Sequence, residues 1–167
     1  MTIYRKLAVA AMLVLAMAVV PCGSAFASQK VNRTKLTALI RNYRTKDSSF
    51  DVVNIGGFLM GLAKNASRLD RDEAAILKGI KSICVVDYCD CPEDIRKGFD
   101  SSLDRILPEE DLLVETKEDG STMRIYGSLS GKGTRVEDVI IHVADEGALI
   151  CLFGSIRMED LNRIMED

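Results

Sequence analysis

The spacing of apolar residues changes near Pro108, and this change constrains the fold more strongly than any other feature of the sequence. Before Pro108 the apolar residues recur every three or four positions, as in amphipathic helices; after it they alternate or run together, as in β-strands. Four strand-like runs follow, in two pairs that each flank an acidic turn ending in glycine: residues 112–117 and 123–129, then 136–144 and 148–156. Such turns predict β-hairpins, so we expect consecutive antiparallel strands in the C-terminal half.

The N-terminal half is expected to be mostly helical. Apolar residues at helical spacing predict one amphipathic helix over residues 32–43 and another that opens at Pro92 and ends before Pro108. The remaining elements that we expect are strands over residues 50–55 and 80–88, helices over 58–66 and 70–79, and a closing helix over 158–165.

Together these elements predict an α+β domain: an antiparallel sheet of about four to five strands, helices packed mainly on one face, and a C-terminal helix. Residues 139–143 and 149–153 are apolar on both sides of the pleat, unlike strands that have one face in water. We therefore expect these two strands to be central, or to have their second face covered by more protein, such as a partner.

The first 27 residues have the zones of a removable signal peptide. Arg5 and Lys6 precede an apolar run, Leu7 to Val20, that is shorter than the roughly 20 residues of a stable membrane span. Small residues then lead to Ala27, so cleavage is expected before Ser28. The sequence thus predicts one exported domain of residues 28–167, periplasmic or extracellular, with no transmembrane anchor after cleavage.

Cys22 offers an alternative for the same segment, because bacterial lipoproteins are cut just before a lipid-modified cysteine. Pro21 precedes Cys22, where the lipoprotein peptidase favours a small, flexible residue. A soluble exported domain is therefore preferred to a lipid-anchored one.

The charge of the mature chain limits its partners. Cleavage removes Arg5 and Lys6, two of the 22 Lys and Arg residues, and none of the 25 Asp and Glu residues, which leaves a net charge of −5 (20 against 25). Nucleic acid and anionic membranes are bound mostly through clustered cations, so neither is expected as the main partner. The basic residues between Lys30 and Lys46 alternate with apolar ones at helical spacing, which predicts the solvated face of a helix.

Cysteines are the most informative candidates for chemistry. Cys84, Cys89 and Cys91 lie close together in the sequence, and a structural disulfide among them is one expectation in an oxidising compartment. Cys91 precedes Pro92 at a predicted helix start, where the helix dipole lowers a thiol pKa, so a Cys89/Cys91 redox pair is an alternative. A third interpretation is that these three cysteines are reduced, partly buried thiols. Cys151 is expected to be a small core residue.

Other constellations have simpler explanations. His142 and the cysteines fit no standard zinc spacing, so we expect no metal and a hydrogen-bonded core histidine. Acid pairs such as Glu137/Asp138 and Asp145/Glu146 are assigned to turns and helix starts, where solvation and capping explain them. Residues 131–134 are expected to be a hairpin connection rather than a phosphate loop, and no cofactor or Ser/His/Asp system is expected.

Two segments of the C-terminal half resemble a family of small exported bacterial proteins: residues 115–126 (ETKEDGSTMRIY) and residues 154–161 (GSIRMEDL). The strand FDVVNI at residues 50–55 and the opening helix also have equivalents there, so the likeness spans roughly residues 32–166. The family is known only as a domain of unknown function, number forty-two fifty-two. The resemblance implies an extracytoplasmic α+β domain with no established activity, and the clustered cysteines are not a feature of that family.

The expected fold explains all the residue patterns described above, and none of them requires a catalytic role. This favours a non-catalytic domain that binds a protein or envelope component, or senses the state of the envelope. A thiol–disulfide redox protein that uses Cys89 and Cys91 is one alternative. A structural homodimer that covers the apolar second face of the sheet is another.

Overall fold

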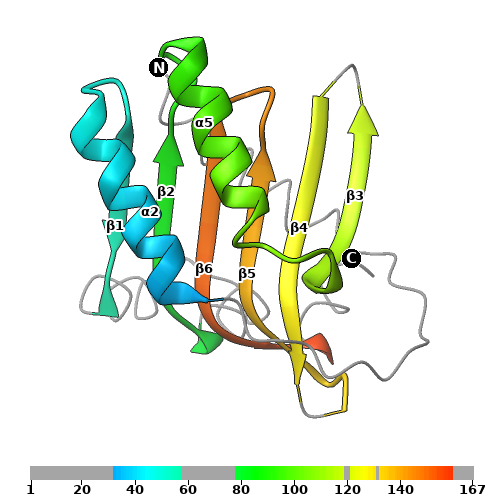
Figure 1. Cartoon of the computed structure of the whole chain (residues 1–167). Helices are drawn as coiled ribbons and strands as arrows, with labels where there is room; N and C mark the ends of the chain where they lie inside the picture. The colour runs from blue at the N-terminus through cyan, green and yellow to red at the C-terminus, as the bar shows by residue number, and fades with distance from the viewer. Residues whose placement is uncertain (1–31, 58–77, 119–120, 131, 160–167) are drawn as a thin grey trace.

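The computed structural model describes residues 32–57, 78–118, 121–130 and 132–159, which form a six-stranded antiparallel sheet and two α-helices (Figure 1). The elements, in chain order, are α2 (Arg33–Lys46), β1 (Asp51–Ile55), β2 (Ile80–Asp87), α5 (Glu93–Asp104), a 3-10 turn (Glu109–Asp111), β3 (Leu112–Glu118), β4 (Ser121–Ser130), β5 (Arg135–Val143) and β6 (Ala148–Arg157). The architecture is α+β, as expected. The helices predicted over 58–66 and 70–79 fall almost wholly outside the described residues.

The sheet has the order β1-β2-β6-β5-β4-β3, so it contains six strands rather than the predicted four to five. The prediction fell short because β2 pairs with β6, a contact between distant parts of the chain that adds β1 and β2 to the C-terminal hairpins. Strands β5 and β6 are central, as their two-sided apolar pattern predicted. Both described helices precede β3, so neither is C-terminal, and the closing helix expected over 158–165 lies almost entirely outside the described residues.

Helices α2 and α5 lie on the same face of the sheet (Figure 1). The side chain of Asn32 caps α2 by accepting a hydrogen bond from the backbone N–H of Lys35, at 3.0 Å. Each helix buries its predicted apolar stripe against the sheet. The opposite, exposed side of α2 carries Lys35, Arg41 and Arg44. No helix in the described ranges has the length and apolar character of a membrane-crossing segment.

Four aromatic rings join the helices to the sheet: Tyr43 on α2, Phe50 before β1, Tyr88 after β2 and Phe99 on α5. Their centroids are 4.8–6.0 Å apart in five pairs, three of which are edge-to-face. Gly98 allows the close crossing of the helices, because a Cβ there would lie 3.0 Å from the hydroxyl of Tyr43. This aromatic cluster fixes the height of α5 above the sheet.

The opposite face of the sheet is also apolar. Its fully buried side chains include Ile125 on β4 and Val139 and Ile141 on β5, which belong to a second core cluster. The helix face of β5 and β6 carries Ile140, Leu149 and Cys151 of the first cluster. The central strands are therefore buried on both sides, in agreement with the sequence pattern.

Candidate functional site

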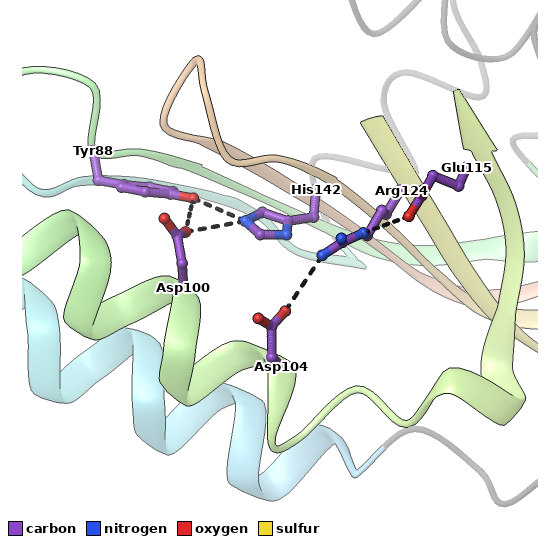
Figure 2. Close-up of polar contacts among 6 residues, drawn as sticks. All are labelled: Tyr88, Asp100, Asp104, Glu115, Arg124 and His142. Atoms are coloured by element: carbon purple, nitrogen blue, oxygen red, sulfur yellow. Dashed lines mark hydrogen bonds and ion pairs between the residues drawn. The ribbon is translucent and has the colours of Figure 1, made fainter. Parts of the chain in front are cut away.

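Three titratable side chains meet between α5 and the sheet (Figure 2). Tyr88 directly follows β2, Asp100 comes from the middle of α5, and His142 comes from β5. The hydroxyl of Tyr88 lies 2.6 Å from Oδ1 of Asp100, and Nε2 of His142 lies 3.1 Å from that oxygen and 3.0 Å from the hydroxyl. We call these residues the Tyr-Asp-His cluster.

The cluster is largely closed to solvent. Tyr88 is 0% exposed, the side chain of His142 is 2% exposed, and that of Asp100 is 24% exposed. Burial raises the pKa of Tyr88 far above its ordinary value, and the hydrogen bond to Asp100 raises this pKa further. The phenol therefore stays protonated and donates to the carboxylate, so Asp100 on the helix is held by a donor from the sheet.

A second group of polar contacts lies beside the cluster, toward the edge of the sheet. Arg124 on β4 is the register partner of His142 on β5. The Nε of Arg124 lies 2.8 Å from Oε2 of Glu115 on β3, and its Nη1 lies 3.8 Å from Oδ1 of Asp104 on α5 (Figure 2). The hydrogen bond from Arg124 is the main cause of a lowered pKa at Glu115. The side chains of this outer group are 34–54% exposed, more than any side chain of the Tyr-Asp-His cluster.

The side chains of the cluster connect α5 to the sheet, and we call such a connection a fastening. Every polar atom that we name in the cluster contacts another member, and Tyr88 and His142 are enclosed beneath α5. A general base must reach a substrate proton within hydrogen-bond distance, and the imidazole here is enclosed. The geometry therefore supports a structural role for these groups more strongly than a catalytic one.

Sequence reasoning placed His142 correctly as a hydrogen-bonded core histidine, but it did not find Tyr88 and Asp100 as its partners. One signal was present: Asp100 and Asp104 are one helical turn apart and lie beside the buried residues Phe99 and Leu103. Acids that flank an apolar stripe face the boundary between helix and sheet, where donors from the sheet can meet them.

The four cysteines of the described chain are free thiols, so the disulfide expected among Cys84, Cys89 and Cys91 is not seen. Cys84 lies on β2, and its register partners are Asn54 on β1 and Cys151 on β6. Cys151 is in the core as predicted, with none of its surface exposed. Closeness in the sequence was misleading, because β2 carries Cys84 away from the loop that holds the other two.

Cys91 is buried rather than accessible at the helix start, with 6% of its surface exposed. Its thiol lies 3.9 Å from Oδ1 of Asp47. Burial raises the pKa of Cys91, and the negative charge of Asp47 adds to the effect. The pKa of Cys91 is thus shifted in the direction opposite to the one expected from the helix dipole, because of burial and the nearby carboxylate.

A second carboxylate joins the helix layer to the sheet. Asp138 sits at an irregularity of β5, with a φ of 55°, and its side chain is 0% exposed. It pairs with the guanidinium of Arg33 at the start of α2 and accepts from the backbone N–H of Gly154 at 3.1 Å. Arg33 also covers the ring of Phe153, 5.1 Å from its centroid. The assignment of Asp138 to a solvated turn is therefore wrong.

Other predicted features lie as follows. The connection after β4 contains Lys132 and Gly133 with positive φ values, and the N–H of Gly133 bonds to the carbonyl of Ser130, so residues 132–134 belong to a hairpin turn as predicted. Gly147 ends the β5–β6 turn with a φ of 62°. Within the described ranges, no group of three or more His, Cys, Asp or Glu side chains is placed to hold a metal ion.

Comparison with known families identifies the family of this chain. The family model described as "Domain of unknown function (DUF4252)" matches residues 43–164, from the last turn of α2 to beyond β6. The chain belongs to the DUF4252 family. The match includes all six strands, α5 and the whole Tyr-Asp-His cluster, while Arg33 precedes it. No curated protein and no solved structure gives a significant match to this DUF4252 chain.

Proposed function

We propose that this DUF4252 chain is an exported, non-catalytic domain that binds an extended segment of an envelope protein along strand β1. The observation that carries the proposal is the exposed edge formed by β1. Val53, near its middle, is 57% exposed, the largest exposure of a large apolar residue in the described chain. An edge strand presents unpaired backbone groups that another extended chain can pair with.

The two edges of the described sheet differ in their protection. The outer strand β3 carries the exposed charges of Glu115 and Lys117, which discourage pairing with a second chain. Strand β1 is Asp-Val-Val-Asn-Ile, and beyond Asp51 it has no charged residue. Main-chain pairing on β1 would supply affinity, and the side chain of Val53 would supply an apolar contact.

The closed Tyr-Asp-His cluster supports a role without catalysis. Its groups that could transfer a proton, on Tyr88, Asp100 and His142, contact each other at hydrogen-bond distance beneath α5. The alternative, a thiol–disulfide reaction at Cys89 and Cys91, has less support because burial and Asp47 raise the pKa of Cys91. Alkylation of the native protein tests it: rapid labelling of both thiols at neutral pH would favour the redox alternative.

Export rests on the sequence of residues 1–27. The full chain, expressed in a Gram-negative host, is expected in the periplasmic fraction with Ser28 as its first residue, as shown by intact mass. A membrane-bound form that begins at a lipid-modified Cys22 would support the lipoprotein alternative. A cytosolic form that still begins at Met1 would contradict export.

Photo-crosslinking tests the docking strand. A photoreactive amino acid is placed at position 53 or, as the control, at Leu129, which is 40% exposed but lies on β4 inside the sheet. Position 53 is expected to give one discrete adduct with an envelope protein. The variant Val53→Asp is expected to bind the same partner with lower affinity, which would support docking on β1. An adduct of twice the chain mass would favour the homodimer, and equal adducts from both positions would contradict docking on β1.

A further inference from the structure

Two cysteine thiols lie side by side in the core beneath the helices. Cys84 on β2 and Cys151 on β6 are directly opposite each other in the strand register. Both side chains belong to the buried cluster beneath the helices, and 5% and 0% of their surfaces are exposed. Opposite residues of an antiparallel pair have Cα atoms about 4.5–5.5 Å apart, within the roughly 4.4–6.8 Å that a disulfide spans.

We propose that Cys84 and Cys151 form a disulfide that joins β2 to β6. The oxidant is a disulfide compound, either a small molecule such as oxidised glutathione or a protein that carries an active disulfide. One cysteine thiolate attacks the oxidant, which forms a mixed disulfide and releases one oxidant thiol; the other cysteine thiolate then displaces the second thiol. The pair loses two electrons and two protons, and the S–S bond of the oxidant is reduced to two thiols.

The burial of the pair determines when these steps can occur. The hydrogen bond from Cys151 lowers the pKa of Cys84, whereas the same contact and burial raise the pKa of Cys151 well above its ordinary value. In the folded core the thiolate, which is the reactive form, is therefore disfavoured most strongly at the fully enclosed Cys151. Because both thiols are enclosed in the native core, the exchange takes place during folding, before α2 and α5 cover this face.

The other cysteines are placed less well to compete for Cys84. Cys91 directs its thiol toward Asp47, and Cys89 lies in the loop that follows β2. Cys84 itself lies within the regular β1–β2 and β2–β6 ladders, so its direct neighbours are Asn54 and Cys151. The ladder therefore selects the pair that is distant in the sequence.

The bond would fasten the two halves of the sheet. Strands β1 and β2 reach the C-terminal hairpins only through the β2–β6 ladder in the described sheet. A covalent link across that ladder closes a long segment of chain, which restricts the unfolded state and stabilises the fold. This inference goes beyond the proposed docking role and does not depend on it.

Peptide mapping of the full wild-type chain tests the pairing. The protein is unfolded in urea and reductant, refolded in a mixture of oxidised and reduced glutathione, and alkylated under denaturing conditions. A protease that cleaves before aspartate separates Cys84 from Cys89 and Cys91, because Asp87 and Asp90 lie between them. The expected product is a Cys84 peptide linked to the Cys151 peptide and about 2 Da lighter than the sum of the two thiol peptides.

The stability of the two redox forms provides a second measurement. The oxidised wild-type chain is expected to unfold at a higher urea concentration than the reduced chain. The variants Cys84→Ser and Cys151→Ser should lose this difference, while Cys89→Ser should keep it. A natively folded product with Cys84 and Cys151 both alkylated would overturn the proposal, and so would a Cys84 bond to Cys89 or Cys91. The mapping uses the wild-type chain, so the test remains decisive even if a serine variant does not fold.

Discussion

Two carboxylates fasten the helices to the sheet, and they do so with different chemistry. Asp138 is on the sheet, is fully buried, and binds the cation of Arg33 on α2 together with a backbone N–H. Asp100 is on α5, is partly exposed, and accepts from Tyr88 and approaches His142. The more deeply buried carboxylate has the fully charged partner, as expected from the cost of removing a charge from water.

The comparison also separates two responses to pH. Arginine stays charged at all accessible pH values, so the Arg33–Asp138 contact keeps its cation. The Tyr-Asp-His cluster depends on a phenol that must keep its proton, and burial opposes the loss of that proton. The two fastenings should therefore fail under different conditions.

The largest effect is expected for Arg33→Met, which keeps apolar cover over Phe153 but leaves the carboxylate of Asp138 without its cation. The free energy of unfolding should fall by about 2–3 kcal/mol, less than for a completely buried pair because the side chain of Arg33 is partly exposed. Urea denaturation at pH 7 measures the change. Arg44→Met, at an exposed position of the same helix, should change stability by less than about 0.5 kcal/mol, and equal effects would show that the ion pair contributes nothing.

Alkaline pH should weaken the second fastening selectively. Because the pKa of Tyr88 is higher in the folded chain than in the unfolded chain, its contribution is complete below about pH 10 and is lost as the pH rises further. The wild type should lose up to about 1.4 kcal/mol per pH unit more than Tyr88→Phe above pH 10. Urea denaturation of both proteins between pH 8 and 11 tests this. If the free energy of unfolding changed with pH in parallel for the two proteins, ionisation of Tyr88 would not be the cause of the alkaline loss.

At neutral pH the same substitution should have a moderate effect. Tyr88→Phe keeps the ring in the aromatic cluster and removes only the hydroxyl that donates to Asp100. A hydrogen bond to a charged acceptor is worth about 1.5–3 kcal/mol, and we expect a loss of about 1.5 kcal/mol because Asp100 keeps its contact with His142. Thermal and urea unfolding at pH 7 measure the loss. Tyr88→Phe in the Asp100→Asn background should cost less, and full additivity would argue that the two residues do not interact.

The sequence predicted features that depend on neighbouring residues and missed those that depend on distant ones. The stripes of α2 and α5 and both C-terminal hairpins follow from local spacing and turns, and the structure contains them. Arg33 and Asp138 are 105 positions apart, and no local pattern connects them. For the same reason the sequence did not identify Cys151 as the neighbour of Cys84: these residues are brought together by the β2–β6 register, which a single sequence does not reveal.

The smallest effect is expected at the exposed ion pair between Glu115 and Arg124. Glu115 has a lowered pKa because Arg124 donates to its carboxylate, so its contribution is present above its ordinary pKa and is lost as the pH falls through the lowered value. Solvent and salt screen this exposed pair, so Glu115→Gln should leave the urea midpoint at pH 7 nearly unchanged. The midpoint of the variant should also fall slightly less than that of the wild type between pH 5 and pH 3. A large loss at pH 7 would mean that the Glu115–Arg124 pair is energetically coupled to the Tyr-Asp-His cluster, and the contrast between a buried fastening and a solvated edge would then be wrong.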